Sequence, residues 1–207
     1  LHKAARRDDQ RAVGARAMLD AAGFPEVKIA ASNQLDEFVI RSLREQGAPI
    51  DIFGVGTSLV TGAPDAALDG VYKLAEAGDE ARIKVSESLG KTTLPGRKQV
   101  HRFSNGDGQF AGIDGVVTLN EAVPARLIHP FEPHKSLTCA DLASEPLLQP
   151  VMRRGQRVAA GRSVEDIRAF AAKRLALLPP EYRRFENPHT YKIGISETLH
   201  RERETLR

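Results

Sequence analysis

The segment IDIFGVGTSLVT, Ile50 to Thr61, decides how the first part of the chain folds. Its short apolar run predicts a buried strand of a parallel sheet, like the preceding run Val27 to Ser32, for which burial on both faces is expected. The run ends at GVGT, and the loops that follow such strands are where α/β proteins bind ligands. Glycine has no Cβ, so an anion can approach the backbone of Gly54 and Gly56 closely, and the hydroxyl of Thr57 adds a donor. A phosphate cradle and a tight strand-to-helix turn both explain these residues.

The sequence before this segment has the same strand and helix pattern. It predicts a helix over 4–22, a strand over 27–32 and a second helix from Leu35 to about residue 46. Ser32 and Asn33 follow the first strand at the same rim as the glycines. They are expected to cap the second helix, to contact the same anion, or both. Strand, helix, strand and glycine turn together predict an α/β fold.

The pattern changes from Ala81 onward. Short, turn-bounded segments favour an antiparallel sheet: ARIKVSES, KQVHRF, GVVTL and ARLIHPF. A hairpin turn is expected in FSNGDGQFAG, and a strand pair or a loop crossing within 146–158. Ser163 and Asp166 predict a capping box for a helix to about Leu178, and a further strand and a charged helix close the chain. The two patterns predict two domains, one over 1–78 that contains the glycine loop and one over 79–207 that is rich in strands.

Composition narrows the classes of function. The 207 residues carry a net charge of +3, no Trp and only 5% aromatic residues, which argues against nucleic-acid binding by base stacking. No apolar run approaches the roughly 18 residues of a membrane span. The one cysteine, Cys139, excludes an intrachain disulfide, and the N-terminal segment lacks the apolar region of a signal peptide. A cytoplasmic protein that contacts neither membrane nor nucleic acid is expected.

Basic residues gather in KVSESLGKTTLPGRKQVHR. They are Lys84, Lys91, Arg97, Lys98, His101 and Arg102. A grip on pyrophosphate and an ordinary charged surface remain equally open. His129 and His134 flank FEP, but no third ligand is suitably spaced, so a structural role is expected and no metal site is predicted.

The segments as an ordered series resemble one family. They are ASNQLDEFVI, QGAPIDIFGVGTSLVT, GVYKLAEAG, KVSESLGKTTLPGRKQVHR, EPLLQPVMRRGQ and LPPEYRRFENPHTYKIGIS. This series is similar to the C-terminal half of nicotinate phosphoribosyltransferase, a type II phosphoribosyltransferase. The resemblance implies the last part of an irregular α/β barrel, then a β-rich flanking domain and C-terminal helices. It also implies ATP-coupled formation of nicotinate mononucleotide and pyrophosphate from nicotinate and phosphoribosyl pyrophosphate.

The resemblance implies two sets of phosphate ligands. The 5′-phosphate of the sugar is expected at Ser32, Asn33, Gly54, Gly56 and Thr57, and pyrophosphate or ATP phosphates at Lys73 and Lys91. Mg²⁺ and ATP are the implied cofactors, and a homodimer is the implied assembly.

The catalytic histidine and the nicotinate-binding residues of the family lie upstream of the matching part. No catalytic role is therefore transferred to any of the six histidines here. We expect this chain to be completed by a missing N-terminal half and to be inactive alone. Two alternatives remain: a non-catalytic subunit that binds phosphate esters, and a phosphoribosyltransferase for nicotinamide or quinolinate.

Overall fold

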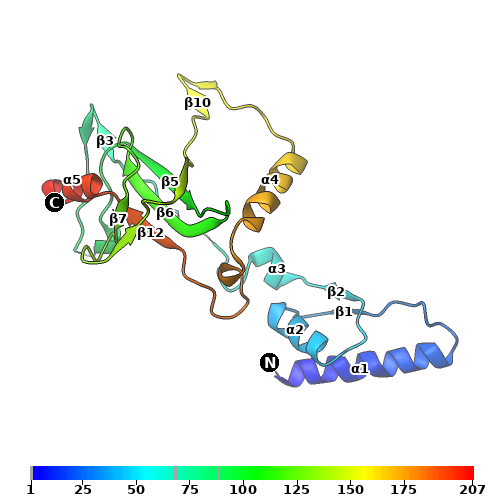
Figure 1. The fold of residues 1–207 in the computed structure, drawn as a ribbon. Coiled ribbons are helices and arrows are strands. Elements are labelled where there is room, and N and C mark those ends of the chain that lie inside the picture. Colours follow the sequence, from blue (N-terminus) through cyan, green and yellow to red (C-terminus); the bar gives the residue numbers. More distant parts are fainter. Residues whose placement is uncertain (1, 68–69, 88) are drawn as a thin grey trace. The chain divides into compact units, whose positions relative to one another are not determined.

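The computed structural model describes residues 2–67, 70–87 and 89–207 (Figure 1). These residues have a mixed α/β fold, and the chain divides into two compact units, Leu1–Val71 and Tyr72–Arg207. The first unit combines helices with two parallel strands, and the second is built on a larger sheet. The domain limits 1–78 and 79–207 stay a prediction.

The first unit contains a small parallel sheet next to its helices. Its elements are α1 (His2–Ala21), β1 (Ala30–Ser32), α2 (Glu37–Glu45), β2 (Ile52–Gly54) and α3 (Thr57–Thr61). β1 pairs with β2 in parallel, with Ser32 opposite Gly54. The sequence pattern places Leu35, Phe38, Val39, Ser42 and Leu43 on one helical face. Leu35, Val39 and Leu43 form the core, whereas Phe38 is 53% exposed.

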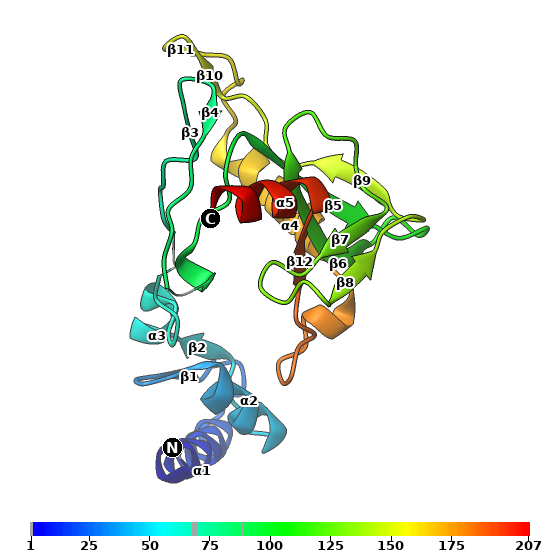
Figure 2. The same cartoon turned by 90° about the vertical axis from the view of Figure 1, so that its left-hand side faces the viewer.

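Two predictions about this unit are wrong. Asp36, not Ser32 or Asn33, caps α2, because its carboxylate accepts a hydrogen bond from the Val39 N–H at 2.8 Å. The strands are not buried on both faces: Ile52 is 50% exposed. α1 and α2 lie on the same side of the sheet (Figures 1 and 2), so no described residue of this unit forms a layer on the other side.

The second unit is built on a six-stranded sheet in the order β8-β7-β12-β6-β5-β9 (Figure 2). The strands are β5 (Lys98–Ser104), β6 (Phe110–Thr118), β7 (Arg126–Ile128), β8 (Ser136–Thr138), β9 (Ala143–Pro146) and β12 (Lys192–Ile195). The antiparallel prediction is confirmed for the β5–β6 pair, whose hairpin turn lies in the predicted glycine-rich segment. β12, which returns to the sheet much later in the chain, pairs with β6 in parallel.

The strand predicted in ARIKVSES is wrong over most of its length. Only Ala81 belongs to a strand, β4 (Glu80–Ala81), which pairs with β3 (Glu76–Ala77). The following residues lie in a loop, where the Lys84 N–H donates to the Thr93 hydroxyl at 2.9 Å instead of to a neighbouring strand. Ser88 lies outside the described residues.

A strand pair does form within 146–158, from β10 (Met152–Arg153) and β11 (Gln156–Arg157). Two short 3₁₀ helices, η1 (Leu89–Lys91) and η2 (Pro180–Tyr182), complete the second unit.

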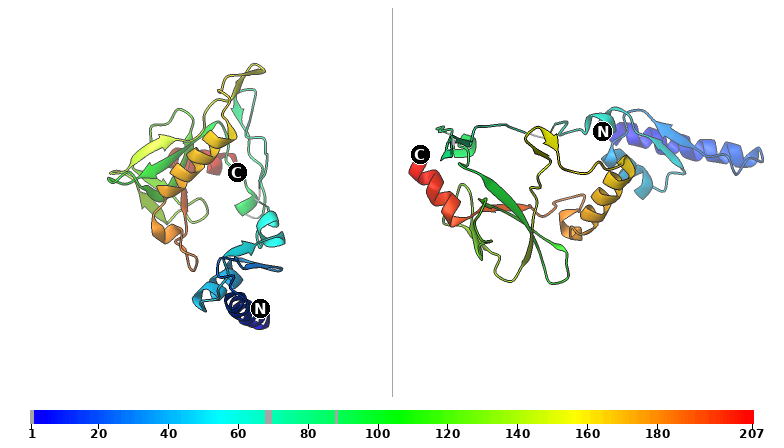
Figure 3. Two further views of the ribbon diagram at one scale, coloured as in Figure 1. Left: turned by 90° about the vertical axis from the view of Figure 1, so that its right-hand side faces the viewer. Right: turned by 90° about the horizontal axis from the view of Figure 1, so that it is seen from above.

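Two helices lie on opposite sides of the sheet (Figure 3). α4 (Val164–Ala176) begins with the predicted capping box of Ser163 and Asp166, and α5 (Glu197–Leu206) closes the chain. One buried cluster contains Phe103, Leu127 and Cys139, and the other contains Ile128, Ile195 and Leu199. None of the helices in the described ranges combines the length and apolar character needed to cross a bilayer.

Candidate functional site

Ser32 and Gly54 form the rim at which the predicted phosphate ligands meet. They are opposite each other at the carboxyl ends of β1 and β2. Gly56 and Thr57 follow two and three residues after Gly54, at the start of α3. Asn33 comes directly after β1 and has a φ of +84°, a left-handed conformation that asparagine tolerates better than most residues. Five predicted ligands are thus gathered in one part of the first unit.

The two glycines of the loop differ in what surrounds them. A Cβ on Gly54 would lie 3.2 Å from the Ser32 Cβ, which is tighter than ordinary contact. A Cβ on Gly56 would have no atom of the described chain within 4 Å. Strand packing therefore explains Gly54, whereas the space over Gly56 is open.

Backbone donors lie next to this open space. The carbonyl of Gly56 accepts from the N–H groups of Leu59 and Val60 at 3.1 and 3.0 Å, which begins α3. The N–H groups of Gly56, Thr57 and Ser58 precede the first bond of this helix, so no α3 carbonyl pairs with them. Together with the exposed Thr57 side chain, they are donors of the kind that binds phosphate oxygens.

Lys73 and Lys91, the predicted ligands of pyrophosphate, belong to the second unit. Both side chains are exposed. Lys91 is the last residue of η1, and Lys73 follows the fully exposed Tyr72. The two lysines stay predicted ligands.

Some basic side chains of this segment form ion pairs or hydrogen bonds, and others are exposed. Arg97 pairs with Glu76 at 2.6 Å, and the Lys98 ammonium donates to the carbonyls of Leu94 and Pro95, both at 3.0 Å. Burial lowers the pKa of Lys98, which the negative charges of Glu202 and Glu76 partly oppose.

Arg102 belongs to a second group of polar side chains, which is partly buried. It donates to both oxygens of Asp114, at 3.0 and 2.8 Å, and this hydrogen bonding raises the pKa of the guanidinium. The Tyr191 hydroxyl donates to the same carboxylate at 2.9 Å. Arg97, Lys98 and Arg102 thus have structural partners, whereas Lys84 and Lys91 are exposed.

The predicted structural role of His129 has a clear basis. Its Nδ1 accepts from the backbone N–H groups of Phe131 and Glu132, at 3.3 and 3.0 Å, and so stabilises the turn after β7. His134 lies 3.9 Å from the Glu132 carboxylate. Within the described ranges, no three His, Cys, Asp or Glu side chains come together in a way that could hold a metal ion.

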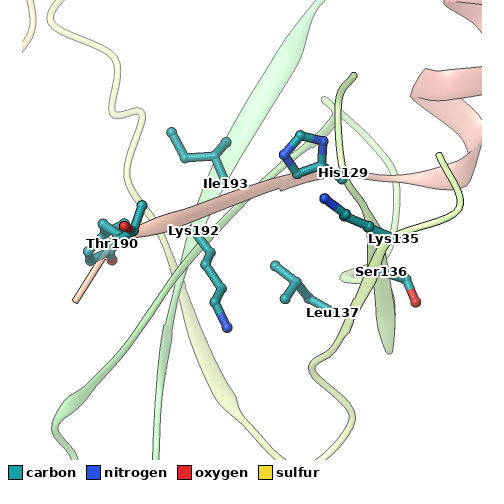
Figure 4. A pocket seen from close by; sticks show the side chains of 8 residues that line it. His129, Lys135, Ser136, Leu137, Thr190, Lys192 and Ile193 are labelled. Carbon is teal, nitrogen blue, oxygen red and sulfur yellow. The ribbon is translucent and has the colours of Figure 1, made fainter. Parts of the chain in front are cut away.

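Sequence reasoning missed a pocket of about 490 Å³ in the second unit (Figure 4). Its wall includes Lys135 and Lys192, which are far apart in the chain and come together only through the sheet. No local motif marks such a site.

Comparisons with known proteins agree with the resemblance seen in the sequence. The family model for the nicotinate phosphoribosyltransferase C-terminal domain matches residues 97–203. Nicotinate phosphoribosyltransferase of Bacillus subtilis is 35% identical over 191 residues, which cover 88% of this chain and 39% of that protein.

Two solved structures are similar to this one. The human nicotinic acid phosphoribosyltransferase structure superposes with a TM-score of 0.64 at 28% identity, over 99% of this chain and 38% of that chain. Nicotinate-nucleotide pyrophosphorylase from Pyrococcus furiosus gives a TM-score of 0.51 at 27% identity, over 78% of this chain and 34% of that one. The chain spans roughly a third to two fifths of the length of the curated relatives it matches. Because the family model matches about half of its residues, the chain belongs to the nicotinate phosphoribosyltransferase family, of which it represents the C-terminal portion.

Proposed function

We propose that this chain holds the 5′-phosphate of phosphoribosyl pyrophosphate within a nicotinate phosphoribosyltransferase. The complete protein joins nicotinate to this sugar, coupled to ATP hydrolysis, and yields nicotinate mononucleotide and pyrophosphate. This reaction brings salvaged nicotinate into NAD synthesis. The family membership of the chain and the names of its relatives support the proposal.

The difference between Gly54 and Gly56 is the observation that carries the proposal. The packing of Ser32 accounts for a glycine at position 54, but no described atom lies where a side chain at position 56 would begin. This open space leaves room for a ligand to approach the backbone at Gly56. The polar groups of Ser32 and Thr57 border the same loop and suit a phosphate.

The proposed chemistry needs positioning and charge stabilisation. The ring nitrogen of nicotinate forms a bond to C1 of the ribose while the bond from C1 to the pyrophosphate oxygen breaks. Positive charge builds on the sugar and negative charge on the leaving group. The loop at Gly56 and Thr57 fixes the far end of the sugar, which holds C1 in line, and Lys73 and Lys91 neutralise pyrophosphate.

The remaining parts of the proposal rest on the family to which the chain belongs. β1 and β2 are two strands of an irregular type II phosphoribosyltransferase barrel, completed by an N-terminal half that carries the catalytic histidine. The chain alone is inactive, and the complete protein is a cytoplasmic homodimer. ATP is the co-substrate. Mg²⁺ arrives with the substrate phosphates.

Turnover assays test this function on the complete protein that contains this chain. Nicotinate, nicotinamide and quinolinate are offered with phosphoribosyl pyrophosphate, with and without ATP, and formation of each mononucleotide is measured. We expect nicotinate to have the highest kcat/KM, and ATP to raise it. Preference for another base would identify a different phosphoribosyltransferase. Binding of the sugar without turnover of any base would identify a non-catalytic subunit.

A further inference from the structure

A wedge opens in the sheet of the second unit between β12 and the β7–β8 hairpin (Figure 4). β12 pairs with β6 along four residues but with β7 only where Ile195 meets Ile128. The two strands separate on the amino-terminal side of Ile195. The pocket of about 490 Å³ occupies this wedge and is large enough for a small organic ligand.

Pro130 explains why the strands separate. In the antiparallel register set by Ile195 and Ile128, the residue opposite Ile193 is Pro130. Proline has no N–H to donate, and the Pro130 carbonyl already accepts from Arg203 at 2.7 Å. The ladder therefore stops there, and the chain turns towards β8.

Three nitrogen-bearing side chains surround this wedge. Lys192 comes from β12, His129 follows β7, and Lys135 precedes β8 (Figure 4). Lys192 and Ile193 leave β12 on opposite sides, and Leu137 provides an apolar surface between the basic groups (Figure 4).

Glycine keeps the neighbouring position on β12 free of a side chain. A Cβ on Gly194 would lie 2.5 Å from the Leu127 Cβ, so the buried Leu127 side chain takes that place.

The hydrogen bonds and charges of these groups favour an anion as the ligand of the pocket. His129 accepts two backbone N–H bonds at Nδ1, so its proton sits on Nε2 and the ring can donate from there. Lys135 forms an exposed ion pair with Glu132 at 2.5 Å. Lys192 is exposed and has no ion pair among the described residues, which leaves one positive charge at the wall.

From this arrangement we propose that the wedge binds a small organic oxyanion, a phosphate monoester or a carboxylate, that carries an apolar group. Lys192 is the main charge partner, His129 and Lys135 are further donors along the pocket wall, and Leu137 contacts the apolar part. The proposal concerns the second unit and does not depend on the phosphate loop of the first.

Isothermal titration calorimetry on the complete protein that contains this chain tests this site. Phenyl phosphate and benzoate supply the two head groups, and phenol is the neutral probe. We expect at least one of the anions to bind and phenol not to bind. In Lys192→Gln the Kd of that anion rises about tenfold, as for loss of a charged hydrogen bond. Lys192→Arg retains most of the affinity, which shows that charge rather than folding is the cause.

Two matched controls separate this site from others. Lys173→Gln removes an exposed lysine on α4 that does not line the pocket, and should leave the Kd unchanged. Gly56→Val alters the phosphate loop and should also leave it unchanged. The proposal is overturned if neither anion binds, or if Lys192→Gln binds like the unaltered chain. Binding that is lost in Gly56→Val but not in Lys192→Gln would also overturn it.

Discussion

Gly54 lies opposite Ser32 in the parallel β1–β2 pair, so close that a Cβ on Gly54 would be 3.2 Å from the Cβ of Ser32. Gly54→Ala should therefore force the Ser32 side chain to move by a few tenths of an ångström and lower the free energy of unfolding by about 1 kcal/mol, the lower end of the usual cost of overpacking. Urea denaturation followed by circular dichroism measures this loss.

Gly14→Ala is the matched control for Gly54→Ala. Gly14 lies within α1, and a Cβ there would meet no atom within 4 Å. Alanine should stabilise this helix by up to about 1 kcal/mol. Equal effects of the two substitutions would contradict the packing explanation for Gly54.

Asp114 joins Arg102 and Tyr191 at the centre of the sheet. Asp114 is only 9% exposed, so Asp114→Ala leaves the Arg102 charge partly buried without its partner. We expect a loss of about 3 kcal/mol in unfolding free energy. Tyr191→Phe removes a single hydrogen bond and should cost about 1 kcal/mol. If the two variants lost the same stability, the ion pair would not have the role assigned to it.

Tyr191 should lose its proton at a higher pH than an ordinary tyrosine does. Burial, followed by its hydrogen bond to Asp114, raises the pKa of this phenol from 10.0 to about 12. The folded chain thus holds the proton more tightly than the unfolded chain. The resulting stability is fully present below pH 10 and is lost as the pH rises towards 12. The difference in unfolding free energy between the unaltered chain and Tyr191→Phe should shrink over that interval. A difference that stays constant from pH 9 to 12 would disprove the shift.

Lys73 is the proposed partner of pyrophosphate or ATP phosphates. In the complete protein, Lys73→Ala should raise the KM for ATP or the Kd for pyrophosphate by about tenfold, as for loss of a charge-assisted hydrogen bond. The KM for nicotinate should stay nearly unchanged. Steady-state kinetics with Lys173→Ala as the control measures both. A selective loss of nicotinate binding would place Lys73 elsewhere in the reaction.

Local patterns in the sequence were sufficient for much of the fold. The helical spacing of Leu35, Val39 and Leu43 predicted the residues that form the core at α2, and Ser163 with Asp166 predicted the start of α4. These features depend on residues close together in the chain. The cap of α2 was misplaced because two left-handed residues, Asn33 and Gln34, delay the start of the helix to Asp36.

Features that depend on distant pairing were not predictable. The wedge arises because Pro130 stops β7 beside β12, which no local segment reveals. The burial predicted for the strand at Ile52 presumed a second layer over the sheet, which the described residues of the first unit do not provide. For the candidate site, sequence patterns suggested the loop at Gly56, but only the coordinates distinguished its open space from the tight contact at Gly54.

The kinetics of Gly56→Val in the complete protein test the central claim most directly. A Cβ at this position would have no described atom within 4 Å, so the loss should appear in binding of the sugar phosphate. We predict a KM for phosphoribosyl pyrophosphate at least about tenfold higher, with the KM for nicotinate changed less than about twofold. A folded Gly56→Val enzyme with an unchanged KM for phosphoribosyl pyrophosphate would contradict the phosphate cradle.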